Sequence, residues 1–131
     1  MKIRLGKPGR KNKANHVHID NFDVWSLDHT LSCIIHPALV RLKETKHGYP
    51  ELFEDGMVTP HHWDRQLHFD FIDEEVETEY LIKKWNDILD KMIYSFYVIK
   101  NEEGYYGEDV DYDVVQEGLD LFSKYYFNLW D

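Results

Sequence analysis

The positive charge of this chain is concentrated at its start, where it forms a candidate anion-binding segment. The first 18 residues contain six Lys or Arg and no Asp or Glu, whereas residues 19–131 have a net charge of −16. Glycines let a backbone approach a ligand closely, and ammonium and guanidinium groups bind phosphate oxygens. Gly6 and Gly9 stand among the candidate phosphate-binding residues, which are Lys7, Arg10, Lys11 and Lys13. The pattern indicates an anionic ligand or, alternatively, a solvated loop that offsets the acidic remainder.

Aromatic and polar residues near expected loops and helix starts form a second candidate group. Trp25 and Tyr49 could stack on a nucleobase, an interaction that typically contributes about 1–3 kcal/mol per base. Asp28 and His29 stand one turn into an expected helix, where they could contact a ribose hydroxyl. Packing, helix capping and ion pairing are the alternative roles for these four residues.

Histidines suggest a metal site as a further possibility. His16 and His18 would point to one face of a strand, and His68 would join them if a second strand paired alongside. This spacing suits a divalent metal, although surface histidines beside a sheet are also common. No Ser-His-Asp order, Walker loop, dinucleotide fingerprint or paired-cysteine site can be assigned. We therefore expect a protein that is not an enzyme and uses no cofactor.

The apolar periodicity predicts the elements that must position these residues. Alternation predicts short strands at 2–5 and 16–19 on either side of the basic segment, and another at 67–71 that could pair with 16–19. Steps of three and four predict helices over about 23–46, from Thr78, and from Tyr112 onward, with a kink or break at Pro37. These elements predict an α+β fold in which three main helices pack with a small antiparallel sheet that covers one side of the core.

The composition narrows the class of protein further. With 43% hydrophobic and 15% aromatic residues, residues 1–131 are expected to form a single domain. No apolar run is long enough for a membrane span, and no secretory signal is expected. Cys33 is the single cysteine, which fits a reducing cytoplasm. The acidic excess argues against long nucleic acid, because it would repel phosphates.

The order of several motifs resembles a family of small acidic proteins encoded by tailed bacteriophages, many of them relatives of T4-like phages. The motifs are Trp25-Ser26-Leu27-Asp28-His29-Thr30-Leu31, then His36-Pro37, Leu42 to Pro50, Trp85, Leu89 to Ile93, Gly118 to Tyr126, and Leu129-Trp130-Asp131. The resemblance implies a protein of the host cytoplasm during phage infection. It also suggests a sponge protein, which binds a cyclic-oligonucleotide defence signal without cleaving it. Residues 51–77 depart from the pattern.

These observations predict a protein that sequesters a small anionic nucleotide, similar to a cyclic dinucleotide, and does not bind a membrane. A homo-oligomer is expected, because a chain of this size rarely encloses such a ligand alone. A metal-dependent phosphoesterase built on the histidines is one alternative. An acidic protein–protein inhibitor or nucleic-acid mimic, using the acidic residues of 73–77, 102–103 and 108–113, is the other.

Overall fold

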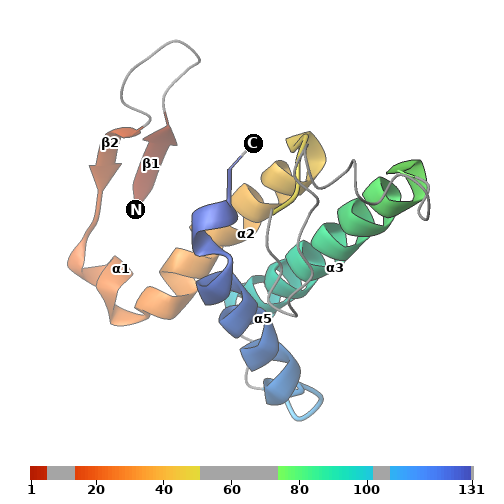
Figure 1. The fold of residues 1–131 in the computed structure, drawn as a ribbon. Coiled ribbons are helices and arrows are strands. Elements are labelled where there is room, and N and C mark those ends of the chain that lie inside the picture. The colour runs from red at the N-terminus through yellow and green to blue at the C-terminus, as the bar shows by residue number, and fades with distance from the viewer. Residues whose placement is uncertain (6–13, 51–73, 102–106, 131) are drawn as a thin grey trace.

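The computed structural model describes residues 1–5, 14–50, 74–101 and 107–130. In these ranges the chain forms an N-terminal hairpin and a group of packed helices (Figure 1). The elements are β1 (Lys2–Leu5), β2 (Ala14–His18), α1 (Asn21–Trp25), α2 (Leu27–Thr45), α3 (Glu74–Lys100), α5 (Tyr112–Lys124) and the 3-10 helix η1 (Tyr126–Asn128). Helix α3 is the centre of this arrangement, because both α2 and α5 pack against it.

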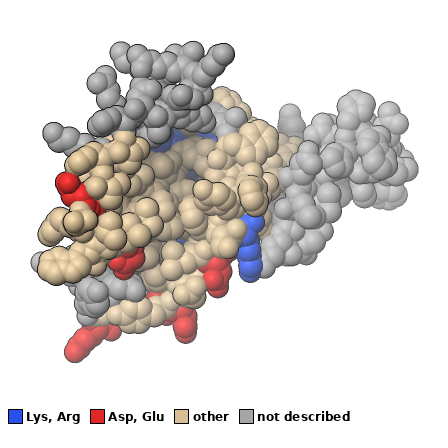
Figure 2. Space-filling view, turned by 90° about the vertical axis from the view of Figure 1, so that its left-hand side faces the viewer, with Lys and Arg blue, Asp and Glu red and all other residues tan. Residues whose placement is uncertain are grey.

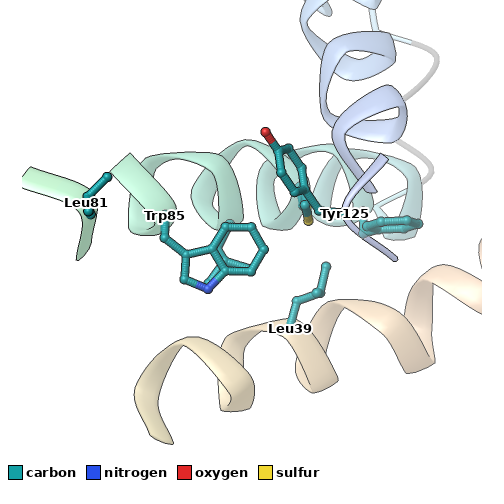
Figure 3. Packing of buried hydrophobic residues seen from close by; sticks show 7 residues of the cluster. Leu39, Leu81, Trp85 and Tyr125 are labelled. Atoms are coloured by element: carbon teal, nitrogen blue, oxygen red, sulfur yellow. The ribbon is translucent and has the colours of Figure 1, made fainter. Parts of the chain in front are cut away.

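The core lies along the side of α3 that the three-and-four periodicity predicts. The main cluster of buried residues consists of Leu39 from α2, Leu81, Trp85, Leu89, Met92 and Phe96 from α3, and Tyr125 after α5 (Figure 3). The Trp85 and Tyr125 rings meet edge to face with centroids 5.6 Å apart, and Phe96 and Phe122 do so at 4.9 Å. Edge-to-face pairs add roughly 0.5–1.5 kcal/mol beyond the burial of their area. The expected packing of three helices is therefore confirmed.

Helices α3 and α5 approach most closely at Gly118. The hydroxyl of Ser95 donates to the carbonyl of Val115 at 2.8 Å and to that of Lys91 at 3.1 Å, so it joins the two helices. A Cβ atom at Gly118 would lie 1.9 Å from Ser95 Oγ and 2.4 Å from the carbonyl oxygen of Lys91. The absence of a side chain at this position is what permits the crossing. Helix α5 also has a defined start, because the Asp111 carboxylate accepts hydrogen bonds from the backbone N–H groups of Asp113 and Val114.

Helix α2 runs antiparallel to α3. The rings of His36 and Tyr97 lie 5.7 Å apart, and Lys43 Nζ donates to Asp90 Oδ1 at 2.5 Å. Moving forward along α2 from His36 to Lys43 thus corresponds to moving backward along α3 from Tyr97 to Asp90. With this register the first turns of α2 extend beyond Lys100, the last residue of α3.

This register corrects the predicted buried face of the first helix. The steps of three and four that predict this helix pass through Leu27, Leu31 and Ala38, and so predict that all three face the core. Leu27 and Leu31 are each 44% exposed, because α3 ends before it reaches them. Ala38 is exposed as well, and its neighbour Leu39 is the residue that enters the core. The prediction was therefore shifted by one residue in the middle of the helix.

Helix continuity differs from the prediction at Ser26, and at Pro37 the structure excludes a break. The predicted helix over 23–46 is two helices, because Ser26 adopts a non-helical backbone conformation with φ −130° and ψ 71°. Pro37, in contrast, does not break the helix, and α2 continues through it from Leu27 to Thr45. The proline removes one backbone hydrogen bond, but the packing of Ile35, Leu39 and Leu42 against the core holds the helix on both sides of it.

The strands form less of a sheet than the predicted α+β fold requires. β1 and β2 pair antiparallel, with Lys2 opposite His18 and Leu5 opposite Ala14. Within the described ranges, however, β1 and β2 mainly contact each other, and the helices mainly contact other helices. No sheet covers the helical core in this part of the chain. The expected strand at 67–71 lies outside the described residues. The described part of the chain is thus mostly helical, with a two-stranded hairpin beside it.

Candidate functional site

The hairpin defines where the basic segment begins and ends. Because Leu5 and Ala14 are register partners, residues 6–13 leave and return to the hairpin at one place. The predicted anion-binding residues Lys7, Arg10, Lys11 and Lys13 belong to this connection and lie outside the described residues. Leu5 and Ala14 form the end of the hairpin that is farthest from α1 (Figure 1).

Polar contacts to the buried residue Asp23 hold helix α1 in place. The Asp20 backbone N–H donates to Asp23 Oδ2 at 2.9 Å, and the Met1 ammonium lies 3.1 Å from the same oxygen. The hydrogen bond from Asp20 is the largest cause that lowers the pKa of the Asp23 carboxyl, and the Met1 ammonium lowers it further, whereas burial opposes the shift. The hydroxyl of Thr30 in turn donates to the Asp23 carbonyl at 2.7 Å. These contacts connect β1, α1 and α2.

The aromatic residues of α1 point away from the protein. Trp25, a predicted stacking residue, is 86% exposed, and Phe22 is 79% exposed. They are three residues apart on a five-residue helix, so they lie on the same side of it. Asp23 is the buried residue of this helix. Helix α1 therefore has the reverse of the usual polarity, with a carboxylate inside and two rings outside.

Asp28 and His29 lie in the first turn of α2, close to Trp25 along the chain. Asp28 is exposed at the helix N-terminus, where a carboxylate interacts favourably with the helix dipole. His29 is half-buried, and its Nε2 lies 3.9 Å from the sulfur of Cys33. These contacts are within one helix, and they leave the Asp28 carboxylate open to solvent.

Tyr49 does not share a site with Trp25. It is half-buried and packs against the main core cluster. Helix α2 separates the two residues, and its 19 residues span roughly 28 Å. Leu5 and Ala14, which flank the basic segment, are also separated from Trp25, since a five-residue strand such as β2 spans roughly 13 Å between its terminal Cα atoms. Of the predicted ligand residues that the structure describes, Trp25, Asp28 and His29 are close along the chain, whereas Tyr49 lies elsewhere, on the core.

The histidines give no metal centre in the described part of the chain. His18 Nε2 lies 2.9 Å from Asp20 Oδ1, and both side chains are exposed. His16 is the register partner of Arg4 in the hairpin, and His68 lies outside the described residues. Among the described residues no group of three His, Cys, Asp or Glu is placed to hold a metal ion.

Two acidic residues form ion pairs between helices. Asp90 on α3 pairs with Lys43 on α2, and Glu117 on α5 pairs with Lys91 on α3 at 2.7 Å. An open groove of about 360 Å³ follows α5, and its lining residues are Asp113, Gln116, Glu117, Asp120, Leu121 and Lys124. Two of its acidic residues already have partners, since Asp120 accepts from Gln116 at 2.9 Å and Glu117 pairs with Lys91. Of the acidic residues expected to form an inhibitor surface, those at 108–113 are described and exposed, including the cap Asp111.

Two features escaped the sequence reasoning. The exposure of Phe22 beside Trp25 was not anticipated, although an Asp between two large apolar residues at helical spacing is a signal for it. His36 was also missed: its Nδ1 is buried without a hydrogen-bond partner, and burial lowers its pKa, with a smaller contribution from the Lys100 ammonium. No local pattern marks this second residue, because its environment comes from α3.

Comparisons with known proteins do not assign the chain to a family. No protein-family model matches the chain, and no curated protein or solved structure matches it significantly. Among the described residues, no helix is both long and apolar enough to span a membrane.

Proposed function

We propose that this chain binds a small anionic nucleotide and holds it without chemical change. The observation that carries the proposal is the pairing of Leu5 with Ala14, which joins both ends of a segment with four cations and no acid. Cations on one short connection repel one another, and a compact polyanion relieves that repulsion. The resemblance to tailed-phage proteins supports a cyclic-oligonucleotide defence signal as the ligand and the host cytoplasm as the place of action.

The charge distribution supports a small ligand over a long one. The remainder of the chain, residues 19–131, has a net charge of −16, so an extended polyanion would be repelled along most of its length. At physiological ionic strength this repulsion is screened beyond roughly 8 Å. A ligand held near Leu5 and Ala14, at the end of the hairpin away from α1, would therefore escape most of this repulsion.

In this proposal Trp25, Asp28, His29 and Tyr49 are not part of the same nucleotide site. Tyr49 belongs to the core, and Trp25 lies beyond the opposite end of the hairpin. Recognition of the base then has to come from the basic segment itself or from a second copy of the chain.

Calorimetric titration with a panel of cyclic di- and trinucleotides tests the proposal. The wild-type chain should bind at least one of them, with an affinity that falls as salt rises, and chromatography should recover the ligand intact after heating. Replacing Lys7, Arg10, Lys11 and Lys13 by Gln should abolish the binding. A control that neutralises the exposed cations Arg41 and Lys83 should retain it.

Absence of heat with every nucleotide, or equal binding by both charge variants, would disprove the proposed site. Recovery of a cleaved ligand would instead favour the phosphoesterase alternative.

A further inference from the structure

The surface formed by α1 and the start of α2 exposes a group of large apolar residues that no other described part of the chain covers. Its apolar residues, here called the α1 face, are Ile19, Phe22, Val24, Trp25, Leu27 and Leu31, each between 44% and 86% exposed. They lie within thirteen consecutive positions, with Ile19 just before α1 and the others on α1 and α2, two helices that contact each other. On the side of the molecule that carries the hairpin and α1, uncharged side chains predominate (Figure 2).

The area of this face is too large for an ordinary monomer surface. Phe22 and Trp25 together expose roughly 300–400 Å² of ring surface, and the half-exposed aliphatic side chains add a comparable amount. The largest apolar patch on a typical monomer covers about 300–600 Å². The total, on the order of 700 Å², is close to the share that one partner contributes to a standard interface of about 800 Å² per side.

The polarity of α1 shows that this exposure is built into the fold. A short surface helix normally buries its apolar residues, but α1 buries Asp23 and turns Phe22 and Trp25 outward. The hydrogen bonds to the Asp23 carboxylate and carbonyl fix that orientation, because a rotation of α1 that buried the two rings would break those bonds. The rings are therefore presented in a fixed position.

We propose that the α1 face is the interface of a homodimer, in which it packs against the same face of a second copy. A two-fold axis brings one surface against itself, so Phe22 and Trp25 of each chain contact the equivalent rings of the other. The net charge of −10 opposes the approach of a second copy. At the α1 face Asp23 is buried and Asp20 is paired with His18, whereas the carboxylate of Asp28 is exposed at its edge, so added salt should favour the contact. The matched area favours a second copy as the occupant. The dimer does not depend on nucleotide binding.

Analytical ultracentrifugation of the ligand-free chain tests this dimer between about 1 and 100 µM. We expect a species of twice the 15.8 kDa chain mass, strengthened as salt rises from 0.05 to 0.5 M, since salt screens the repulsion between acidic copies. Trp25→Ala and Phe22→Glu should each raise the dimer dissociation constant at least roughly 30-fold, the usual effect of losing a central aromatic residue. Circular dichroism should show unchanged helix content, because both side chains are already exposed.

Trp130→Ala is the matched control, because Trp130 is 74% exposed and lies near the end of the chain rather than on α1. It should leave the dimer intact. A wild-type chain that stays monomeric throughout would overturn the proposal and assign the face to a different occupant. A dimer that weakens with added salt, or that Trp130→Ala dissociates while Trp25→Ala does not, would also overturn it. Each of these results is independent of the nucleotide titration.

Discussion

Replacement of Gly118 by Ala tests the close crossing of α3 and α5. The added Cβ would lie 1.9 Å from Ser95 Oγ and 2.4 Å from the carbonyl oxygen of Lys91, whereas ordinary contacts begin near 3.4 Å. The serine can rotate, but the Lys91 carbonyl is helix backbone, so the helices must separate by about 1 Å. That movement also breaks the hydrogen bond between Ser95 and Val115.

The expected cost follows from three opposing contributions. Overpacking costs roughly 1–3 kcal/mol, and the lost hydrogen bond with its unpaired carbonyl costs roughly 1–3 kcal/mol. The better helix propensity of alanine returns about 1 kcal/mol. We therefore expect Gly118→Ala to lower the free energy of unfolding by about 1–5 kcal/mol, and to lower Tm by roughly 3–20 °C in a domain of this size.

Urea unfolding followed by circular dichroism measures this change. Gly48→Ala is the matched control, because no atom lies within 4 Å of the added Cβ, and its stability should change by less than about 0.5 kcal/mol. Ser95→Ala combined with Gly118→Ala should recover part of the loss, since the closest clash is with the serine hydroxyl. If Gly118→Ala were as stable as the wild type, helix propensity would outweigh the crossing and the reasoning would be refuted.

Three further predictions concern single side chains. Asp111→Ala should lower the free energy of unfolding by about 1 kcal/mol in urea titrations, because it removes the cap of α5; no change would mean that water caps the helix equally well. The lowered pKa of His36 favours its neutral form in the folded state, so the free energy of unfolding should fall as pH drops below about 6.5. This fall should be smaller in His36→Phe, which keeps a ring against Tyr97. Equal pH profiles of the two proteins would contradict this. The lowered pKa of Asp23 contributes stability above about pH 4 that is lost on further acidification. The deficit of Asp23→Asn in urea midpoints should therefore shrink at acid pH; a deficit that did not change with pH would show that the carboxylate charge does not cause it.

Much of the helical structure was predictable from local patterns. The steps of three and four along α3 identified Leu81, Trp85 and Met92 as core residues, and each is at most 2% exposed. The start of α5 at Tyr112 was also predicted correctly. These features depend on residues within one or two turns of each other, and such spacing is visible in a single sequence.

The candidate site was less predictable, because exposure depends on distant partners. Trp25 was expected near the start of a helix, but it is the last residue of α1, because the helix breaks at Ser26. Its exposure accompanies the burial of Asp23, which lies on the other side of α1. Tyr49 was a candidate for stacking and instead packs on the core. Periodicity could not separate these two outcomes, since it reports which residues share a face and not what covers that face.

The sequence by itself determined the separation of charge, the helical faces of α3 and α5, and the two strands that enclose the basic segment. Only the tertiary structure decided which of those faces are covered. Helix α3 ends at Lys100, so the apolar residues Leu27 and Leu31 of α2 extend past it and stay exposed. The pairing of Leu5 with Ala14 likewise places both ends of the basic segment at the end of the hairpin that is farther from Trp25. The physical reason is that periodicity arises from neighbouring residues, whereas burial requires a partner that the chain brings in from far along its length.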